Sequence, residues 1–280
     1  MIPGIYTNLS NEDYHAADGI SKSGLDDIAV NPAYYQMRRA AREAKQDDEK
    51  ECFRVGRAAH VAVIEPDRFS KQYLVAKFDR KSRTAWSSLE AKNPDKTCIT
   101  PSEYDDYMRM AEAVRKHPAA KEILQKGYAE TSIFHTDEQT GELVKVRPDW
   151  FIEDVLADLK TTRERGAAAE SFERACFSYR YFVQAPFYMD VAGDRLRRTF
   201  NSFVFIVVEK GSYQVAVYYA DADMIRLGRE EYRRNLDVYA RCRRSGVWPG
   251  YNDGEIRPVS LPAWAKRQLD GANYDQSTNF

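Results

Sequence analysis

The residues in this chain that are best suited to chemistry are two aspartates and a lysine, Asp149, Asp158 and Lys160. If residues 155–159 form a strand, its two-residue period points Asp158 and Lys160 to one face and Leu159 to the other. Asp149 lies on the preceding strand, so a hairpin would bring the two carboxylates side by side. Carboxylates about 4 Å apart repel by roughly 4 kcal/mol at an effective dielectric constant near 20, so such a pair normally holds a cation. Oxygen ligands favour Mg²⁺ or Mn²⁺, and a lysine beside the ion suits the attack of water on a phosphodiester.

The elements that position these residues change in character along the chain. In the first half, we expect helices from Ser21 or Ser23 to Val30, from Pro32 to Ala44, from Cys52 to Ile64 and from Pro101 to His117, with Pro66 closing the third. In the second half, short β-branched runs predict strands over 132–135, 143–152, 155–159, 203–208 and 213–220. A helix from Ala167 to Ala192 with a break near Phe177, and another from Ala222 to Arg244, complete the pattern. This order predicts an α/β fold with a mixed central sheet flanked by helices.

We expect one domain over residues 1–250. Its part over 1–127 is predicted to be a mostly helical N-terminal elaboration that includes the His60 helix, and 128–250 to hold the catalytic sheet and its helices. Residues 251–280, rich in Gly and Pro at their start, are expected to form an irregular or partly disordered tail.

At these residues the chain resembles the PD-(D/E)XK nucleases, with Pro148-Asp149 as the first motif and Asp158-Leu159-Lys160 as the second. The wider pattern is similar to the RecE-like (exonuclease VIII) group. The stretches that carry the similarity are Gly19-Ile20-Ser21-Lys22-Ser23-Gly24-Leu25, Gly56-Arg57-Ala58-Ala59-His60, Ala129 to Phe134, Arg147 to Asp149, Asp158 to Thr162 and Tyr179 to Tyr188. Together they span about residues 4 to 245 and are far more specific than the catalytic tripeptide.

The resemblance implies roles residue by residue. His60, Asp149 and Asp158 would hold Mg²⁺, for which Mn²⁺ can substitute, with the Leu159 carbonyl and Glu130 as further ligand candidates. Lys160 would assist the attacking water, and Gln184 and Tyr188, four residues apart on one helix face, would organise water, metal or phosphate. A packed core histidine at position 60, an interhelical hydrogen bond from Gln184 and an Asp–Lys ion pair at the strand end are the structural alternatives.

The resemblance also implies a substrate. The expected activity is Mg²⁺-dependent exonucleolytic hydrolysis of linear double-stranded DNA from its ends, in the 5′ to 3′ direction, in phage-type homologous recombination. The expected partners are DNA ends, a single-strand annealing recombinase and copies of the same chain in a ring-like trimer or tetramer. Ser21, Lys22 and Ser23 at a helix N-terminus are candidate phosphate contacts, with ordinary capping as the alternative. A structure-selective endonuclease or nickase, or a DNA-binding protein without catalysis, are the alternative functions.

The composition of the chain limits which partners and cofactors we expect. The net charge of −1 gives no global positive field, so DNA binding must depend on local patches, such as residues 77–83 and the helix of Arg233 and Arg234. A solvated helix face explains such a patch equally well. Cys52, Cys98, Cys176 and Cys242 have no metal or disulfide spacing, and Asn31 stands where iron–sulfur relatives have a cysteine, so we expect reduced thiols and no cluster. With neither a membrane span nor a signal pattern in the sequence, we expect a cytoplasmic protein.

Overall fold

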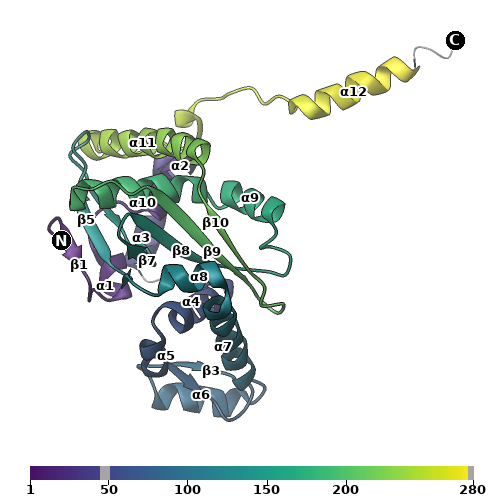
Figure 1. The fold of residues 1–280 in the computed structure, drawn as a ribbon. Coiled ribbons are helices and arrows are strands. Elements are labelled where there is room, and N and C mark those ends of the chain that lie inside the picture. Colours follow the sequence, from purple (N-terminus) through teal and green to yellow (C-terminus); the bar gives the residue numbers. More distant parts are fainter. Residues whose placement is uncertain (45–50, 277–280) are drawn as a thin grey trace.

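The structure is a computed structural model that describes residues 1–44 and 51–276 (Figure 1). Its N-terminal part contains β1 (Gly4–Tyr6), α1 (Asn11–Ala16), α2 (Lys22–Val30), α3 (Pro32–Glu43), α4 (Glu51–Ile64), α5 (Pro66–Gln72), β2 (Tyr73–Val75), α6 (Arg83–Lys92), β3 (Thr97–Ile99), α7 (Pro101–Lys116) and α8 (Pro118–Leu124). The remainder contains β4 (Tyr128–Ala129), β5 (Ser132–Thr136), β6 (Leu143–Val146), β7 (Trp150–Ile152), β8 (Val155–Thr162), α9 (Ala169–Ser178), α10 (Tyr181–Leu196), β9 (Ser202–Glu209), β10 (Val215–Tyr219), α11 (Ala222–Ser245), a 3₁₀ turn (Tyr251–Gly254) and α12 (Ala263–Gln276).

Local side-chain chemistry explains where the expected helices begin. The Ser21 hydroxyl accepts from the Gly24 N–H at 3.5 Å, and the Asn31 side chain accepts from the Tyr34 N–H at 2.8 Å, one residue before Pro32. A side-chain oxygen at this position satisfies an N–H that has no partner inside the helix. Pro66 differs from our expectation, because it occupies the first turn of α5 as well as following α4. Proline is tolerated there since that N–H has no helical partner.

The central sheet has the order β10-β9-β8-β7-β4. β8 and β9 run parallel, from the pair Val155↔Ser202 to the pair Thr162↔Glu209, and the other neighbours are antiparallel. β1, β5 and β6 form a second sheet, and β2 and β3 form a short parallel pair beside α6. The expected mixed sheet, and with it the expected fold class, is confirmed.

Helices cover both faces of the central sheet (Figure 1). On one face, Phe203, Phe205 and Val207 of β9 join a core that includes α2, α10 and α11. On the other face, Ile206 and Val208 pack against α4 and α7. β9 is therefore buried on both sides, which explains its continuous apolar run. On the first face, α10 and α11 approach so closely that a Cβ on Gly228 would lie 1.7 Å from the Phe182 carbonyl oxygen.

The expected strand over 143–152 is wrong in one respect, because the chain breaks it at Pro148. Residues 143–146 pair with β5 in the second sheet, whereas 150–152 pair with β8 in the central sheet. Proline cannot donate a ladder hydrogen bond, which favours a break at this point. Asp149 is consequently held where the chain passes from one sheet to the other.

The C-terminal residues, for which we expected irregular structure, contain the 3₁₀ turn and α12. Figure 1 shows α12 extending away from the sheet and its helices. Ile256 and Val259, before α12, are almost fully exposed. The packed part of the described chain thus ends near α11.

Two further expectations concern cysteines and membranes. Cys98, Cys176 and Cys242 are free thiols, and the side chain of Cys52 lies outside the part of the chain whose side chains the structure describes. Within residues 1–44 and 51–276, each helix is too short or too polar to span a bilayer.

Candidate active site

His60 of α4, Glu130 after β4 and Asp149 before β7 form one cluster. The His60 Nε2 lies 3.0 Å from Asp149 Oδ2 and 3.3 Å from Glu130 Oε1. One ligand atom from each residue can be chosen so that all three lie within 4.8 Å of one another. An imidazole nitrogen and carboxylate oxygens at this separation are a suitable donor set for a divalent cation.

The backbone brings these three residues together. α4 lies directly against the end of β8, since a Cβ on Gly56, one turn before His60, would be 3.5 Å from Thr161 Oγ1. Glu130 adopts a left-handed conformation, with φ of 49°, and its N–H donates to the Asp149 carbonyl at 3.1 Å. A non-glycine residue in this conformation is unfavourable and persists only where its surroundings impose it. The strained turn therefore fixes the Glu130 carboxylate beside Asp149.

Charge interactions inside the cluster shift its pKa values. Burial lowers the pKa of His60, but Asp149 and Glu130 outweigh it and raise the pKa to about 9. Burial raises the pKa of Glu130 to about 7, against the attraction of His60. The pKa of Asp149 is lowered, because His60, Lys160 and the Leu159 N–H together outweigh its burial. Two carboxyl groups that repel each other beside an imidazole are an arrangement that a divalent ion would relieve.

Asp158 and Lys160 of β8 form a second group with Gln184 of α10. Lys160 Nζ lies 2.7 Å from Asp158 Oδ2 and donates to Gln184 Oε1 at 2.9 Å, while Gln184 Nε2 donates to Asp158 Oδ1. The expected alternation holds, since Leu159 points to the opposite face and packs with the α4 and α7 core. Gln184 thus contacts both the Asp158 carboxylate and the Lys160 ammonium.

The Asp158 carboxylate has unused bonding capacity. It is only 3% exposed, and its Oδ2 makes an ion pair with Lys160 but no hydrogen bond with regular geometry among the described residues. Burial, and then Asp149, raise the pKa of Asp158. Burial opposes the charge of Lys160, but Asp158, Tyr181 and Asp149 outweigh it and raise the pKa of the ammonium. A buried carboxylate oxygen in this condition fits a metal ligand.

Asp149 connects the two groups. Its Oδ2 accepts from the Leu159 N–H at 2.7 Å. The last ladder pair between β7 and β8 is Trp150↔Ala157, so beyond it the N–H of Leu159 is available to a side chain. In an extended strand, the N–H and C=O of one residue point to the same edge, so the Leu159 carbonyl also faces the Asp149 side. The residues present therefore fit the expected divalent ion.

Tyr188 is one helical turn after Gln184 on α10. Burial raises its pKa well above the ordinary value, and Tyr14, Asp158, Asp149 and Glu130 add to the rise. The phenol is therefore neutral and lies within electrostatic range of the three carboxylates. It remains a hydrogen-bond donor at any pH near neutrality.

Arg147 is a site neighbour to which the sequence reasoning assigned no role. It is 8% exposed, its Nη1 lies 3.8 Å from Glu130 Oε2, and its Nε donates to Ser132 Oγ at 2.8 Å. It also donates to the Leu9 carbonyl at 3.0 Å, which ties the N-terminal segment to this edge. In the sequence, the position of Arg147 directly before Pro148-Asp149 is the feature that could have indicated a place beside the site. Arg147 positions Glu130 and partly balances its charge.

The candidate phosphate contacts on α2 lie beside this site. Lys22 Nζ donates to the Tyr179 carbonyl at 2.7 Å, pairs with Asp26 at 2.7 Å and lies 5.9 Å from the Tyr181 ring centre. Ser21 caps α2, and the Ser21 and Ser23 hydroxyl oxygens are 3.0 Å apart. The capping role of Ser21 is therefore observed.

The candidate arginines on α11 have different surroundings. Arg233 pairs with the buried Asp137 and so holds the β5–β6 hairpin against α11. Arg234 pairs with Glu231 but is two-thirds exposed, and together with Asp237, Arg241 and Arg244 it lines a shallow hollow of about 300 Å³. The open basic surface on this helix therefore belongs to Arg234 and its neighbours rather than to Arg233.

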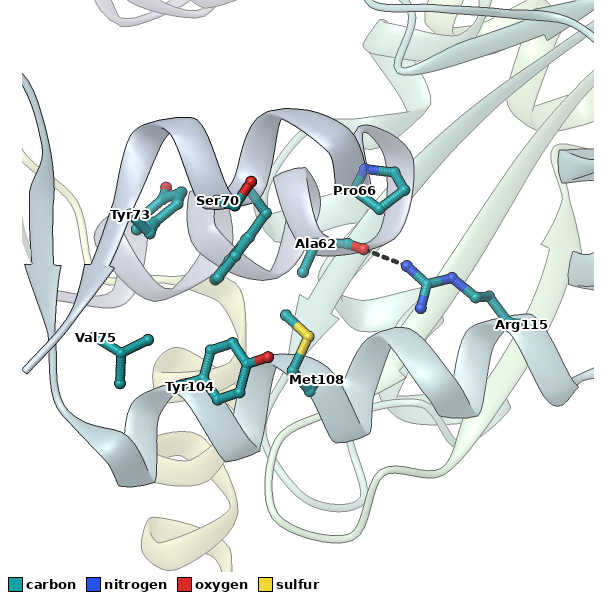
Figure 2. Close-up of a pocket in the computed structure, with 9 residues that line it drawn as sticks. Ala62, Pro66, Ser70, Tyr73, Val75, Tyr104, Met108 and Arg115 are labelled. Atoms are coloured by element: carbon teal, nitrogen blue, oxygen red, sulfur yellow. Dashed lines mark hydrogen bonds between the residues drawn. The ribbon is translucent and has the colours of Figure 1, made fainter.

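A second hollow of about 320 Å³ lies between α5 and α7, as Figure 2 shows. Tyr73, Tyr104 and Met108 line it, and Arg115 at one end donates to the Ala62 carbonyl at 2.6 Å. None of the candidate site residues lines this groove.

Comparisons with known proteins give a family and a fold for this chain. The profile of a family described as "PDDEXK-like domain of unknown function (DUF3799)" matches residues 21–256. Among solved structures, the fold is similar to the crystal structure of a "Putative exonuclease" from Eubacterium rectale, with a TM-score of 0.57 and 14% sequence identity over 94% of this chain and 99% of that chain. At this identity, the likeness establishes a shared fold. The search of curated proteins gave no match.

Proposed function

This chain belongs to the PDDEXK-like domain family DUF3799, and on that premise we propose that it is a divalent-metal-dependent nuclease that hydrolyses DNA phosphodiester bonds. The observation that carries the proposal is the meeting of two groups at one strand end: the His60, Glu130 and Asp149 cluster, and the Asp158–Lys160 pair bridged by Gln184. A purely structural ion pair does not require two further carboxylates and an imidazole beside it.

In this proposal, His60, Asp149 and Asp158 hold Mg²⁺ or Mn²⁺, with Glu130 and the Leu159 carbonyl as further ligands. The ion supplies Lewis-acid chemistry at the phosphodiester. The Lys160 ammonium, whose pKa is raised chiefly by Asp158 against its burial, offsets negative charge that develops on the phosphate. Gln184 fixes the Lys160 ammonium through its side-chain carbonyl, and the neutral phenol of Tyr188 donates to water or phosphate.

The finer proposal is exonucleolytic digestion of linear duplex DNA from 5′ ends. It is supported by the similarity to the RecE-like motifs and by the word exonuclease in the description of the similar structure. On α2, Ser21, Lys22 and Ser23, and on α11, Arg234, would contact phosphates of the DNA. Action in recombination beside a single-strand annealing protein, a ring-like trimer or tetramer and a cytoplasmic location complete the proposal.

The experiment compares linear duplex DNA with covalently closed circular duplex, each with Mg²⁺, Mn²⁺ or EDTA. We expect the linear DNA to be degraded to short products in Mg²⁺ or Mn²⁺, the circles to survive and EDTA to abolish digestion. Asp158→Ala and Lys160→Ala should each lower the rate by about 10³ or more, because members of a cooperating set act together. Lys116→Ala is the matched control, because the Lys116–Glu112 pair is exposed.

Two results would contradict the proposal at different levels. Full digestion in EDTA would exclude the metal site and the nuclease mechanism built on it. Circles cut as fast as linear DNA would replace the exonuclease with an endonuclease on the same residues.

A further inference from the structure

The C-terminal end of α9 and the turn that follows it present two aromatic side chains to solvent. Phe177 is 76% exposed and Tyr179 is 64% exposed, although they are only two residues apart. Single exposed aromatics are common on protein surfaces, but neighbouring ones beside a candidate site indicate a binding surface.

A continuous series of rings connects this turn to the catalytic strand. The Tyr179 ring centre lies 5.7 Å from that of Tyr181, and Lys160 Nζ lies 4.0 Å from the Tyr181 ring centre. Tyr181 also packs against Phe205 of β9, with 6.0 Å between the ring centres. Phe177 stacks on Phe182 at 6.0 Å with an angle of 13° between the rings. The Tyr181 ring therefore lies between the exposed Tyr179 ring and the Lys160 ammonium.

The backbone of the turn is held in one conformation. Arg180 has a φ of 55°, which is unfavourable for a residue with a side chain. Its guanidinium pairs with Asp26 of α2 at 2.9 Å and with Glu231 of α11 at 3.1 Å. The Tyr179 carbonyl accepts from Lys22 of α2 at 2.7 Å. Two helices thus hold a strained turn that orients the rings outward, and strain of this kind is concentrated at functional sites.

The charged groups that hold the turn are paired with one another. Asp26 pairs with both Lys22 and Arg180, and Glu231 pairs with Arg180. The turn therefore offers flat apolar faces next to charges that are already paired. Nucleobases have such faces, but inside a duplex their neighbours cover them, so an internal base must be unpaired to stack on a protein ring.

We propose that Phe177 and Tyr179 are a stacking surface for unpaired bases of the DNA strand that enters the candidate site. The proposal rests on the proposed nuclease function and names the part of the substrate that this surface recognises. A strand separated from its complement at a DNA end would leave its bases free to stack here while its backbone reaches Lys160. One stack strengthens binding by roughly 5- to 150-fold.

The experiment uses two fluorescein-labelled probes of about 12 nucleotides, an oligodeoxythymidylate and an abasic strand of the same length and charge. Fluorescence anisotropy in EDTA measures binding of each probe without cleavage. Wild type should bind the thymidylate at least roughly fivefold more tightly than the abasic strand. The double variant Phe177→Ala/Tyr179→Ala should lose this difference, and Tyr179→Phe, which keeps the ring, should retain it.

Tyr219, on β10 of the central sheet, provides a matched control. Tyr219 is 73% exposed, and its neighbour Tyr218 stacks on Phe172 of α9, so Tyr219 points to the opposite face of the sheet. Tyr219→Ala should leave the discrimination between the probes unchanged. Thermal unfolding and sedimentation velocity of each variant check that fold and oligomeric state are preserved.

The outcomes separate this proposal from the proposed function. Equal binding of both probes by wild type, with Mg²⁺-dependent cleavage intact, would refute the stacking surface and leave the nuclease. Discrimination between the probes by a protein that never cleaves DNA would refute the nuclease and leave a base-binding surface. A double variant that changes oligomeric state and keeps its discrimination would make the two rings a contact between copies of the chain, which overturns the proposal.

Discussion

Lys160→Met tests whether the centre of the site is a buried ion pair. The side chains of Lys160 and Asp158 are 16% and 5% exposed, and 2.7 Å separates their charged atoms. Methionine keeps most of the volume and removes the charge, so Asp158 would lie buried beside Asp149 with no counter-charge from its own strand. Breaking one partner of a buried pair costs about 3–5 kcal/mol. For a chain of this size, that corresponds to a fall in Tm of roughly 6–20 °C.

The assay is thermal and urea unfolding in EDTA at pH 8, followed by Mn²⁺ addition. Adding Asp158→Asn to Lys160→Met should restore much of the lost free energy, because the buried charge is then absent, and the double-mutant cycle measures the coupling. Mn²⁺ should stabilise Lys160→Met more than wild type, since the ion replaces the missing positive charge. Lys116→Met, in an exposed pair, should change the unfolding free energy by less than about 1 kcal/mol. If Lys160→Met were as stable as Lys116→Met in EDTA, the buried-pair reasoning would be refuted.

Further predictions address other parts of the site and fold. His60→Ala should raise the Mg²⁺ concentration needed for half-maximal cleavage, and an unchanged requirement in a Mg²⁺ titration would assign His60 to packing alone. Mn²⁺ at about 100 times its Kd should raise the wild-type unfolding free energy by about 2.7 kcal/mol, and Glu130→Gln should reduce the gain; equal Tm shifts would exclude Glu130 as a ligand. Arg234→Gln with Arg241→Gln should lower the salt dependence of duplex binding by about one unit of slope per lost phosphate contact, and an unchanged slope would remove this surface from the DNA path. Burial lowers the pKa of Lys145 to about 8, so the unfolded chain holds a proton that the folded chain releases. Wild type should therefore gain stability relative to Lys145→Met as pH rises from about 8 to 10.5, and parallel stability curves would contradict this.

Several parts of the site followed from short-range patterns. The two-residue period of a strand was enough to place Asp158 and Lys160 on one face and Leu159 on the other, as the contacts with Gln184 and the α4 core confirm. Ser21 was predictable as a helix cap because its hydroxyl bonds to an N–H only three residues away. Such features depend on residues at most four positions apart, so the sequence contains all the information that they need.

Two other expectations differ from the structure at proline residues. Pro148 interrupts the apolar run over 143–152 and sends its halves to different sheets. Pro66 follows the end of α4, as expected, and also lies in the first turn of α5. Proline marks a boundary in either case, and the tertiary environment decides what lies beyond it.

The composition of the site was decided by tertiary structure. Glu130 meets His60 because α4 packs against the end of β8 and because a left-handed turn ties Glu130 to Asp149. The role of Arg147 depends on a distant N-terminal segment that folds back over it. The exposed rings at the α9–α10 turn owe their orientation to ion pairs from α2 and α11. A periodic pattern specifies which face a residue occupies, but only the packing of elements that are remote in sequence specifies which faces meet.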